Sequence, residues 1–354
     1  MNFEVDKNDL RCTRFDRVDS VPLNDGEIRL VVDSFALTSN NITYAAFGDV
    51  MQYWNFFPAA GEAWGRIPVW GFADVAESRH PDIRSGTRVY GFMPMSTVFV
   101  VSPSQVNEQG FTDIAPHRQG MASTYNRYAY VSESSLHLPS REEHHMLLWP
   151  LFFTSYLIDD VISEAGGFGA ESVVISSASS KTALITAYLL HARGDKVIGL
   201  TSPDNREFVE SLGCYSGVFT YDNLQALPTD TAVYVDIAGD ARVTTAVHEH
   251  YGDNLTHSMI VGNTHWDESS RPSATLPGPT PTFFFAPNQI AKRTAEWGSA
   301  ELDQRVSSSW EHFYAWASKW VEFQYVVGHQ AVDSVYRELL DGHSNPRVGY
   351  ICSL

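Results

Sequence analysis

Between Glu171 and Asn263 the sequence alternates between short apolar runs and stretches with helical periodicity. The runs SVVIS, KVIGLTS, AVYVDIAG and HSMIVGN are rich in β-branched residues, which favours strands. Between these runs, residues 181–193, 204–212 and 243–250 carry apolar side chains at helical spacing. Strands that alternate with helices are joined by right-handed crossovers, so the pattern predicts a parallel sheet in an α/β fold.

The connection between the first strand and the first helix is SSASSKTA, from Ser176 to Ala183, and it contains no glycine. A dinucleotide pyrophosphate needs a tight turn, close backbone approach and free N–H groups at a helix N-terminus. Serine and alanine are the smallest residues after glycine, and serine hydroxyls and Lys181 can contact phosphate oxygens. Two interpretations stay open here: a phosphate loop built from serine, or a plain turn between strand and helix. A triphosphate P-loop fits poorly, because Ile175 and Ser180 occupy its glycine positions.

The second strand of this region ends in Thr201 and Ser202, with Arg206 shortly after. Proteins that bind NAD usually place an Asp or Glu at this point to accept from the ribose 2′-hydroxyl. Hydroxyl groups followed by an arginine suit a 2′-phosphate instead. The alternative interpretation is a serine that caps a helix and an arginine exposed to solvent.

Residues 1 to about 135 predict a compact β domain, because strand-like runs at 27–37, 68–78 and 86–93 are separated by glycine and proline. The segment from Thr38 to Pro58 is dense in Asn, Tyr and Trp, which suits the wall of a ligand pocket. The alternative is a turn at Asn40 and Asn41 with core aromatics. Further along, the periodicity predicts helices at 147–165 and 299–321 and a strand at FFFAPNQI (283–290). The tail predicts a helix, a turn and a closing strand.

The composition of the chain argues against several classes of function. A length of 354 residues suits two domains, and a net charge of −18 argues against nucleic-acid binding. The sequence has no apolar run of 18 or more residues and no signal-like N-terminus, so neither a membrane span nor secretion is expected. Three widely spaced cysteines fit a reducing cytoplasm. The pairs His144-His145 and His248-Glu249-His250 lack metal-ligand spacing, and no metal site is expected.

Several segments together resemble the medium-chain dehydrogenase/reductase superfamily, in its zinc-free quinone-oxidoreductase and enoyl-reductase branch. They are EIRLVVDSFALTSNNITYAAFGD, IPVWGFADVAESRHPDIRSGTRVYGF and the closing AVDSVYRELLDGHSNPRVGYICS. More narrowly, NNITYA, YWNFFP, RIPVWGFADV and SSASSKTA are similar to a bacterial and fungal branch known as a domain of unknown function.

The resemblance implies an α/β fold made of a GroES-like β-barrel domain and a Rossmann domain with a doubly wound parallel sheet. The barrel would comprise residues 1–140, completed by 322–354. The Rossmann domain would comprise residues 141–321, with a helical insertion near 299–321. Gly71-Phe72-Ala73 stands where the zinc enzymes have Gly-His-Glu, which implies a zinc-independent protein.

The resemblance also implies NADPH as the cofactor. Arg206 and Tyr221 keep the 15-residue spacing of a basic residue and a tyrosine in NADPH-using members. Pyrophosphate would be held by Ser177, Ser179, Ser180 and Lys181, and the 2′-phosphate by Thr201, Ser202, Arg206 and Tyr221. Gly239, Gly262 and Phe285 would approach ribose and nicotinamide.

The expected activity is reduction of a carbonyl or activated alkene in a small molecule of apolar or aromatic character. Without zinc, a protein group must donate to the oxygen that gains negative charge. Tyr44 is the first candidate donor, Asn41 an orienting amide, and Tyr53 and Tyr125 are the alternatives. The second hypothesis is a non-catalytic NADPH-binding sensor or scaffold on the same fold. We expect a cytoplasmic homodimer that pairs partly through FFFAPNQI and binds neither nucleic acid nor membrane.

Overall fold

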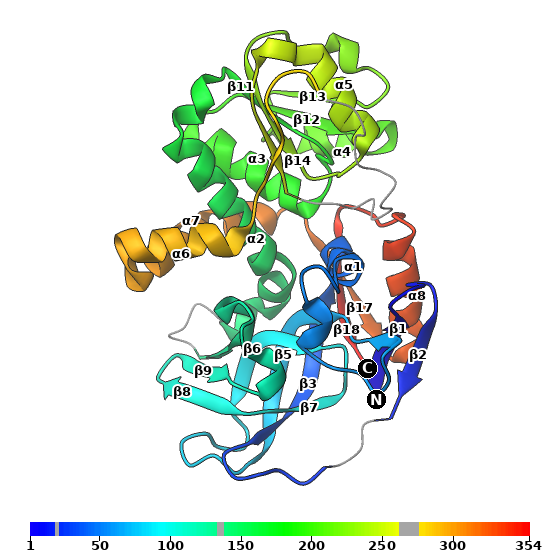
Figure 1. The fold of residues 1–354 in the computed structure, drawn as a ribbon, viewed down its shortest axis with the longest axis vertical. Coiled ribbons are helices and arrows are strands. Elements are labelled where there is room, and N and C mark those ends of the chain that lie inside the picture. Colours follow the sequence, from blue (N-terminus) through cyan, green and yellow to red (C-terminus); the bar gives the residue numbers. More distant parts are fainter. Residues whose placement is uncertain (18–20, 133–137, 262–275) are drawn as a thin grey trace. The chain divides into compact units, whose positions relative to one another are not determined.

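The structure, a computed structural model, describes residues 1–17, 21–132, 138–261 and 276–354. The chain divides into two compact units (Figure 1). Unit 1 comprises Met1–Pro150 and Val321–Leu354, and unit 2 comprises Leu151–Trp320. Unit 1 is therefore formed by both ends of the sequence, while unit 2 is one continuous segment.

Unit 1 is built on two sheets. The smaller sheet has the order β2-β1-β4 and consists of β1 (Asn2–Asp6), β2 (Thr13–Asp16) and β4 (Trp64–Gly65). The larger sheet has the order β17-β18-β3-β5-β6-β10-β9-β8, with β7 also paired to β3. Its strands are β3 (Ile28–Leu37), β5 (Pro68–Ser78), β6 (Arg88–Pro94), β7 (Val98–Val101), β8 (Pro103–Asn107), β9 (Gly110–Asp113), β10 (Arg127–Tyr130), β17 (Glu322–Val327) and β18 (Val348–Ser353).

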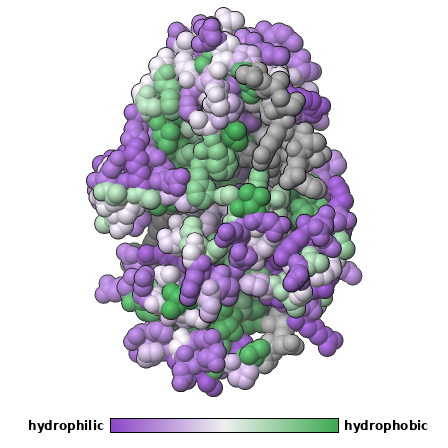
Figure 2. All heavy atoms as spheres, in the orientation of Figure 1, coloured by the Kyte–Doolittle hydropathy of each residue, from purple (hydrophilic) through white to green (hydrophobic). Residues whose placement is uncertain are grey.

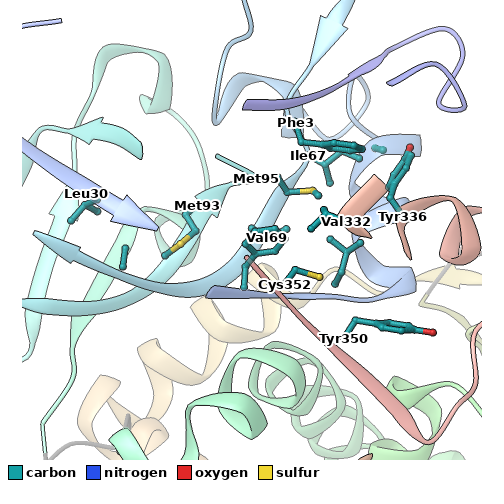
Figure 3. Packing of buried hydrophobic residues seen from close by; sticks show 14 of the residues in the cluster. Phe3, Leu30, Ile67, Val69, Met93, Met95, Val332, Tyr336, Tyr350 and Cys352 are labelled. Atoms are coloured by element: carbon teal, nitrogen blue, oxygen red, sulfur yellow. The ribbon is translucent and has the colours of Figure 1, made fainter. Parts of the chain in front are cut away.

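Alternate side chains of these strands form one core, to which the C-terminal helix contributes. Val69 of β5 and Met93 of β6 lie in this core with Val332 and Tyr336, which come from α8 (His329–Leu340) (Figure 3). The remaining helical segments of unit 1 are α1 (Ser39–Ala46), η1 (Tyr53–Asn55), η2 (Pro116–Arg118), η3 (Ser123–Asn126), η4 (Pro139–Arg141) and the first part of α2 (Glu142–Glu164).

Unit 2 contains one parallel sheet of six strands in the order β13-β12-β11-β14-β15-β16. The strands are β11 (Ser172–Ile175), β12 (Val197–Thr201), β13 (Gly217–Thr220), β14 (Ala232–Asp236), β15 (Leu255–Ile260) and β16 (Thr282–Phe283). Counted from β11, this is the 3-2-1-4-5-6 order of the Rossmann fold. The strand order reverses between β11 and β14, the point at which such sheets bind ligands.

Helices cover both faces of this sheet, because successive residues of each strand point to opposite sides. Val173 and Ile175 pack with α2 and with α3 (Lys181–Arg193), whereas Val174 packs with α5 (Ala241–Tyr251). The other helices of the unit are η5 (Gly166–Gly169), η6 (Pro203–Asn205), α4 (Arg206–Ser211), η7 (Leu224–Ala226), η8 (Gly252–Asn254), α6 (Ala286–Trp297) and α7 (Ser299–Ala317).

The segment FFFAPNQI differs from its expected structure. Only Thr282–Phe283 forms a strand, and α6 begins at Ala286, so the strand expected over 283–290 is wrong beyond its first residue. Pro287 lies in the first turn of α6, where its missing N–H interrupts no helical hydrogen bond. The helix is then held to α2 by Arg293, whose Nε lies 2.6 Å from Asp160 Oδ2. The side chain of this arginine is only 8% exposed.

Residues Pro139–Glu164, which include α2, form one helix long and apolar enough to cross a membrane by length and composition. Half of its apolar window is buried within the structure. Figure 2 shows polar residues over most of one face, interrupted by smaller apolar areas. Large apolar side chains such as Phe283 (61%) and Tyr325 (65%) are exposed.

Asp159 of α2 makes the stability of the protein depend on pH. Burial raises the pKa of Asp159 to about 6, although Arg193 opposes the shift. Arg193 Nη1 lies 2.9 Å from Asp159 Oδ1 without hydrogen-bond geometry, and it donates instead to the Asp159 carbonyl. A carboxyl with a raised pKa binds its proton more tightly in the folded state. It therefore lowers the free energy of unfolding as the pH rises from about 4 to 6.

We expect Asp159→Asn to raise the free energy of unfolding at pH 7 by on the order of 1–2 kcal/mol and to change it little at pH 4. Denaturant unfolding at a series of pH values measures this difference. Asp230→Asn is the control, because that carboxyl is about half exposed and pairs with Lys196 at 3.4 Å. A stability difference of the same size at both pH values would contradict the prediction.

Candidate functional site

Each unit contains one group of candidate residues. In unit 2 it is the connection from β11 to α3, Ser176 to Ser180, which lies at the carboxyl end of the sheet. Ser180 caps α3, its Oγ accepting from the Ala183 N–H at 3.4 Å. Ser177 has a φ of +52°, a left-handed conformation that glycine adopts without steric cost. Serine thus occupies a backbone conformation here that glycine adopts more readily.

Polar side chains from neighbouring connections hold the backbone of this loop. The Ser177 N–H donates to Tyr221 Oη (2.9 Å), Tyr215 Oη donates to the Ala178 carbonyl (2.9 Å), and Asn205 Nδ2 donates to Ser179 Oγ (3.2 Å). The Ser179 N–H itself has no hydrogen-bond partner in the described part of the chain. An N–H left free just before a helix N-terminus is suited to bind an anion.

A glycine does permit the close packing of this loop, but it lies in the adjacent strand. A Cβ atom on Gly199 of β12 would lie 2.9 Å from Ala178 Cβ and 2.9 Å from Tyr215 Cδ1. These distances are shorter than real Cβ contacts, so only glycine fits there. The Ala178 N–H meanwhile donates to the Leu200 carbonyl at 2.8 Å, which fixes the loop against β12.

Only some of the expected 2′-phosphate residues are in contact: the Tyr221 N–H donates to the Thr201 carbonyl at 3.2 Å. Thr201 is 1% exposed, and its Oγ1 has no hydrogen-bond partner among the described residues. Ser202 is the N-cap residue that precedes η6, and Arg206 begins α4 with its side chain 52% exposed and its Nε 2.8 Å from Glu210 Oε1. Tyr221 contacts the loop at Ser177, and burial raises its pKa to about 12. No hydrogen bond or ring contact in the described ranges joins Arg206 to Tyr221.

The remaining candidates of unit 2 lie at its strand and helix ends. Lys181 is the first residue of α3, and burial lowers its pKa to about 8. Gly239 has a φ of +66°, and its N–H donates to Asp236 Oδ1 at 3.0 Å. Phe285 precedes α6, with its ring 6.5 Å from that of Phe283. Gly262 lies outside the described residues.

In unit 1 the structure brings the three candidate tyrosines into one aromatic cluster, although they lie far apart in the sequence. The rings of Tyr44 and Tyr53 are 4.6 Å apart, and those of Tyr53 and Tyr125 are 5.9 Å apart. The hydroxyls of Tyr53 and Tyr125 are separated by 3.4 Å. Burial raises the pKa of all three phenols well above the usual value, so they stay protonated at neutral pH.

Tyr44 differs from the other two in the groups that approach its oxygen. Trp70 Nε1 donates to Tyr44 Oη at 3.4 Å. Sequence reasoning did not identify Trp70 as a partner of Tyr44, because the two residues lie 26 positions apart in the sequence.

The side chain of Asn41 contacts the protein backbone. It is the third residue of α1 and forms a capping box, in which its Oδ1 accepts from the Thr38 N–H at 2.8 Å. Its Nδ2 donates to the Pro68 carbonyl at 2.9 Å, and the residue is 4% exposed. Both ends of the Asn41 amide are thus occupied by the backbone.

The region matching the zinc ligands of related enzymes is apolar core, because Phe72 and Ala73 are both fully buried. Within residues 1–17, 21–132, 138–261 and 276–354, no group of three His, Cys, Asp or Glu side chains could hold a metal ion.

The chain matches one protein-family model, and its fold is similar to that of several solved structures. The family model described as "Protein of unknown function (DUF2855)" matches residues 35–345. No curated protein matches the sequence. CurA from Vibrio vulnificus superposes with a TM-score of 0.63 at 11% identity, over 99% of this chain and 96% of that one.

Two further solved structures are similar. The yhdH oxidoreductase from Salmonella enterica, solved in complex with NADP, has a TM-score of 0.55 at 15% identity, over 97% of this chain and 95% of that one. The quinone oxidoreductase from Coxiella burnetii has a TM-score of 0.55 at 11% identity, over 100% and 98%. These likenesses confirm the expected GroES-like barrel and Rossmann domain. The chain belongs to the DUF2855 family and has the fold of the medium-chain dehydrogenases/reductases.

Proposed function

We propose that the protein is an NADPH-dependent oxidoreductase that reduces a carbonyl or activated alkene in an apolar small molecule. The observation that carries this proposal is the loop from Ser176 to Ser180, which keeps a left-handed residue and a capped helix start at the switch point of a Rossmann sheet. CurA was also solved in complex with NADPH, with a TM-score of 0.61 to this chain at 11% identity.

The residues of unit 2 fit a dinucleotide phosphate. Ser177, Ser179, Ser180 and Lys181 would hold the pyrophosphate, since the Ser179 N–H has no partner among the described residues and the loop precedes a helix N-terminus. Thr201 brings to the end of β12 a buried hydroxyl that has no partner in the described part of the chain, and Ser202, Arg206 and Tyr221 follow it. Gly239 and Phe285 would approach the ribose and nicotinamide. The bound cofactor would supply the hydride for the reduction.

The chain itself must then stabilise the negative charge that reduction leaves on the substrate oxygen. Tyr44 is suited to donate a hydrogen bond or proton there. Its oxygen accepts from Trp70 Nε1, a contact that does not use the phenol hydrogen. We infer no direct role for Asn41, because its amide is bonded to the backbone at both ends.

Arg206→Ala is expected to weaken NADPH binding about tenfold and to leave NADH binding unchanged. A guanidinium forks onto phosphate oxygens, but this one is half exposed, which limits the loss. Fluorescence titration of both cofactors measures the effect. Glu210→Gln is the matched control: it frees Arg206 from its ion pair and should keep or tighten NADPH binding. Equal losses for both cofactors, or a wild type that prefers NADH, would refute the 2′-phosphate assignment.

A measurement of turnover distinguishes an enzyme from a non-catalytic sensor with the same fold. We expect NADPH consumption with members of a panel of quinones, enones and ketones. Cofactor binding without turnover across the whole panel would favour the non-catalytic sensor or scaffold.

We further propose that the protein works as a cytoplasmic, zinc-independent homodimer. The edge strand β16 supports pairing, because it ends the sheet and Phe283 is 61% exposed. The apolar Phe72 and Ala73 support independence from zinc. A monodisperse monomer in light scattering would overturn the homodimer. One tightly held zinc per chain in elemental analysis would overturn the independence from zinc.

A further inference from the structure

A buried serine and a buried aspartate join the two strands at the switch point. Ser176 follows β11 directly and is fully buried, while Asp236 ends β14 and is 4% exposed. Ser176 Oγ donates to Asp236 Oδ1 at 2.8 Å. This contact ties the start of the phosphate loop to the neighbouring strand, 60 residues along the chain.

The Ser176 hydroxyl uses its full hydrogen-bonding capacity. Besides donating to Asp236, its oxygen accepts from the N–H groups of Ile237 and Ala238, both at 2.9 Å. A hydroxyl has one hydrogen and two lone pairs, so none is left over. One side chain thereby fixes the backbone on both sides of the switch point.

Asp236 extends the same network into unit 2. Its Oδ1 also accepts from Tyr234 Oη at 3.2 Å and from the Gly239 N–H at 3.0 Å, and its Oδ2 accepts from Thr244 Oγ1 at 2.9 Å. No cation pairs with this carboxyl in the described part of the chain. Buried polar networks that are fully satisfied are rigid, and partial loss is costly because the remaining groups are left unpaired.

We propose that Ser176 and Asp236 form a clamp that positions the glycine-free loop for the cofactor pyrophosphate. A left-handed serine such as Ser177 is strained and persists only where its surroundings hold it. The clamp fixes the residue just before Ser177, and the Tyr221 hydroxyl holds its N–H. Ser176 and Asp236 are positioning residues, because they act on the loop and not on the ligand. This inference rests on the proposed function.

Ser176→Ala tests the clamp, with Ser172→Ala as the matched control. Ser172 lies on the same strand and is 3% exposed, but its Oγ has no hydrogen-bond partner among the described residues. We expect Ser176→Ala to weaken the binding of NADPH and of NADH about tenfold each, because both cofactors carry the pyrophosphate. Ser172→Ala should bind both like wild type. Titrations are made well below the melting temperature of each variant.

Two further measurements test the contact between Ser176 and Asp236, and the second of them tests the clamp without any cofactor. In a double-mutant cycle, Ser176→Ala combined with Asp236→Ala should lose less affinity than the sum of the single losses, since they share one contact. In the cofactor-free protein, Ser176→Ala should speed hydrogen exchange of the amides at 177–180, and Ser172→Ala should not.

The outcomes are distinct. A Ser176→Ala variant that melts earlier but keeps wild-type loop exchange and wild-type affinities overturns the clamp. A wild type that binds neither cofactor overturns the proposed function. In that case, faster loop exchange in Ser176→Ala still supports a clamp on the loop, and unchanged exchange refutes it.

Discussion

Tyr44→Phe is expected to lower kcat about 100-fold or more while leaving the NADPH Kd unchanged. Phenylalanine keeps the ring contacts with Tyr53 at 4.6 Å and Phe92 at 5.5 Å and removes only the hydroxyl. Because burial raises the pKa of Tyr44 well above the usual value, the phenol keeps its proton at neutral pH. The wild-type kcat should therefore show no step from this group between about pH 6 and 9.

Tyr53→Phe and Tyr125→Phe are the matched comparisons, since they remove a hydroxyl from the same aromatic cluster. Steady-state kinetics with the best substrate of the panel gives kcat and KM for all three variants. A large loss confined to Tyr125→Phe would transfer the donor role to Tyr125. Wild-type rates in all three variants would exclude the phenols as donors.

Arg118→Leu is expected to lower the free energy of unfolding by about 3 to 5 kcal/mol. The side chains of Arg118 and Asp113 are 1% and 2% exposed, with Nε and Oδ2 3.0 Å apart. Removing the arginine leaves the Asp113 carboxyl buried without its counter-charge. The Arg118 guanidinium also lies 4.6 Å from the Phe57 ring and donates to the Tyr125 carbonyl at 3.1 Å, so the aromatic cluster loses support as well.

Denaturant unfolding measures this loss. The control is Arg11→Ala, whose ion pair with Asp341 is exposed, with side chains 58% and 36% accessible. That substitution should change stability by less than about 1 kcal/mol. A loss of similar size in both variants would contradict a special cost of burial at Arg118.

The Rossmann half of the fold could be predicted from the sequence because its signals are local. The helix expected at 181–193 has those bounds in the structure, since Ser180 caps its start and Gly194, with a φ of +103°, ends it. The helix α6 was missed because the run FFF favours a strand, and Pro287 was not recognised as a helix-start residue. The strand β17 was missed as well, although the aromatic residues Phe323 and Tyr325 alternate with the polar Glu322 and Gln324.

The candidate site was harder to predict because its residues meet only through tertiary structure. Tyr44, Tyr53 and Tyr125 could be proposed as separate candidates, but no spacing rule places them in one cluster. The capping contact of Asn41 with Thr38 is local, whereas its contact with Pro68 depends on tertiary structure. The role of Gly199 was equally hidden, since its neighbour Ala178 is 21 residues away in sequence.

The position of β18 in unit 1 affects the order in which the strands can pair during translation. This strand pairs with β3, Ile351 lying opposite Ala36, and Tyr350 and Cys352 enter the same core as Leu30 (Figure 3). The strands of unit 2 end at Phe283, so they are synthesised well before β18. On the edge of β3 that pairs with β18, residues 35–37 therefore stay without their partner strand until residues 350–352 have been made. Nascent chains stalled shortly before Val348 would carry the strands of the Rossmann sheet and a barrel that still lacks β18.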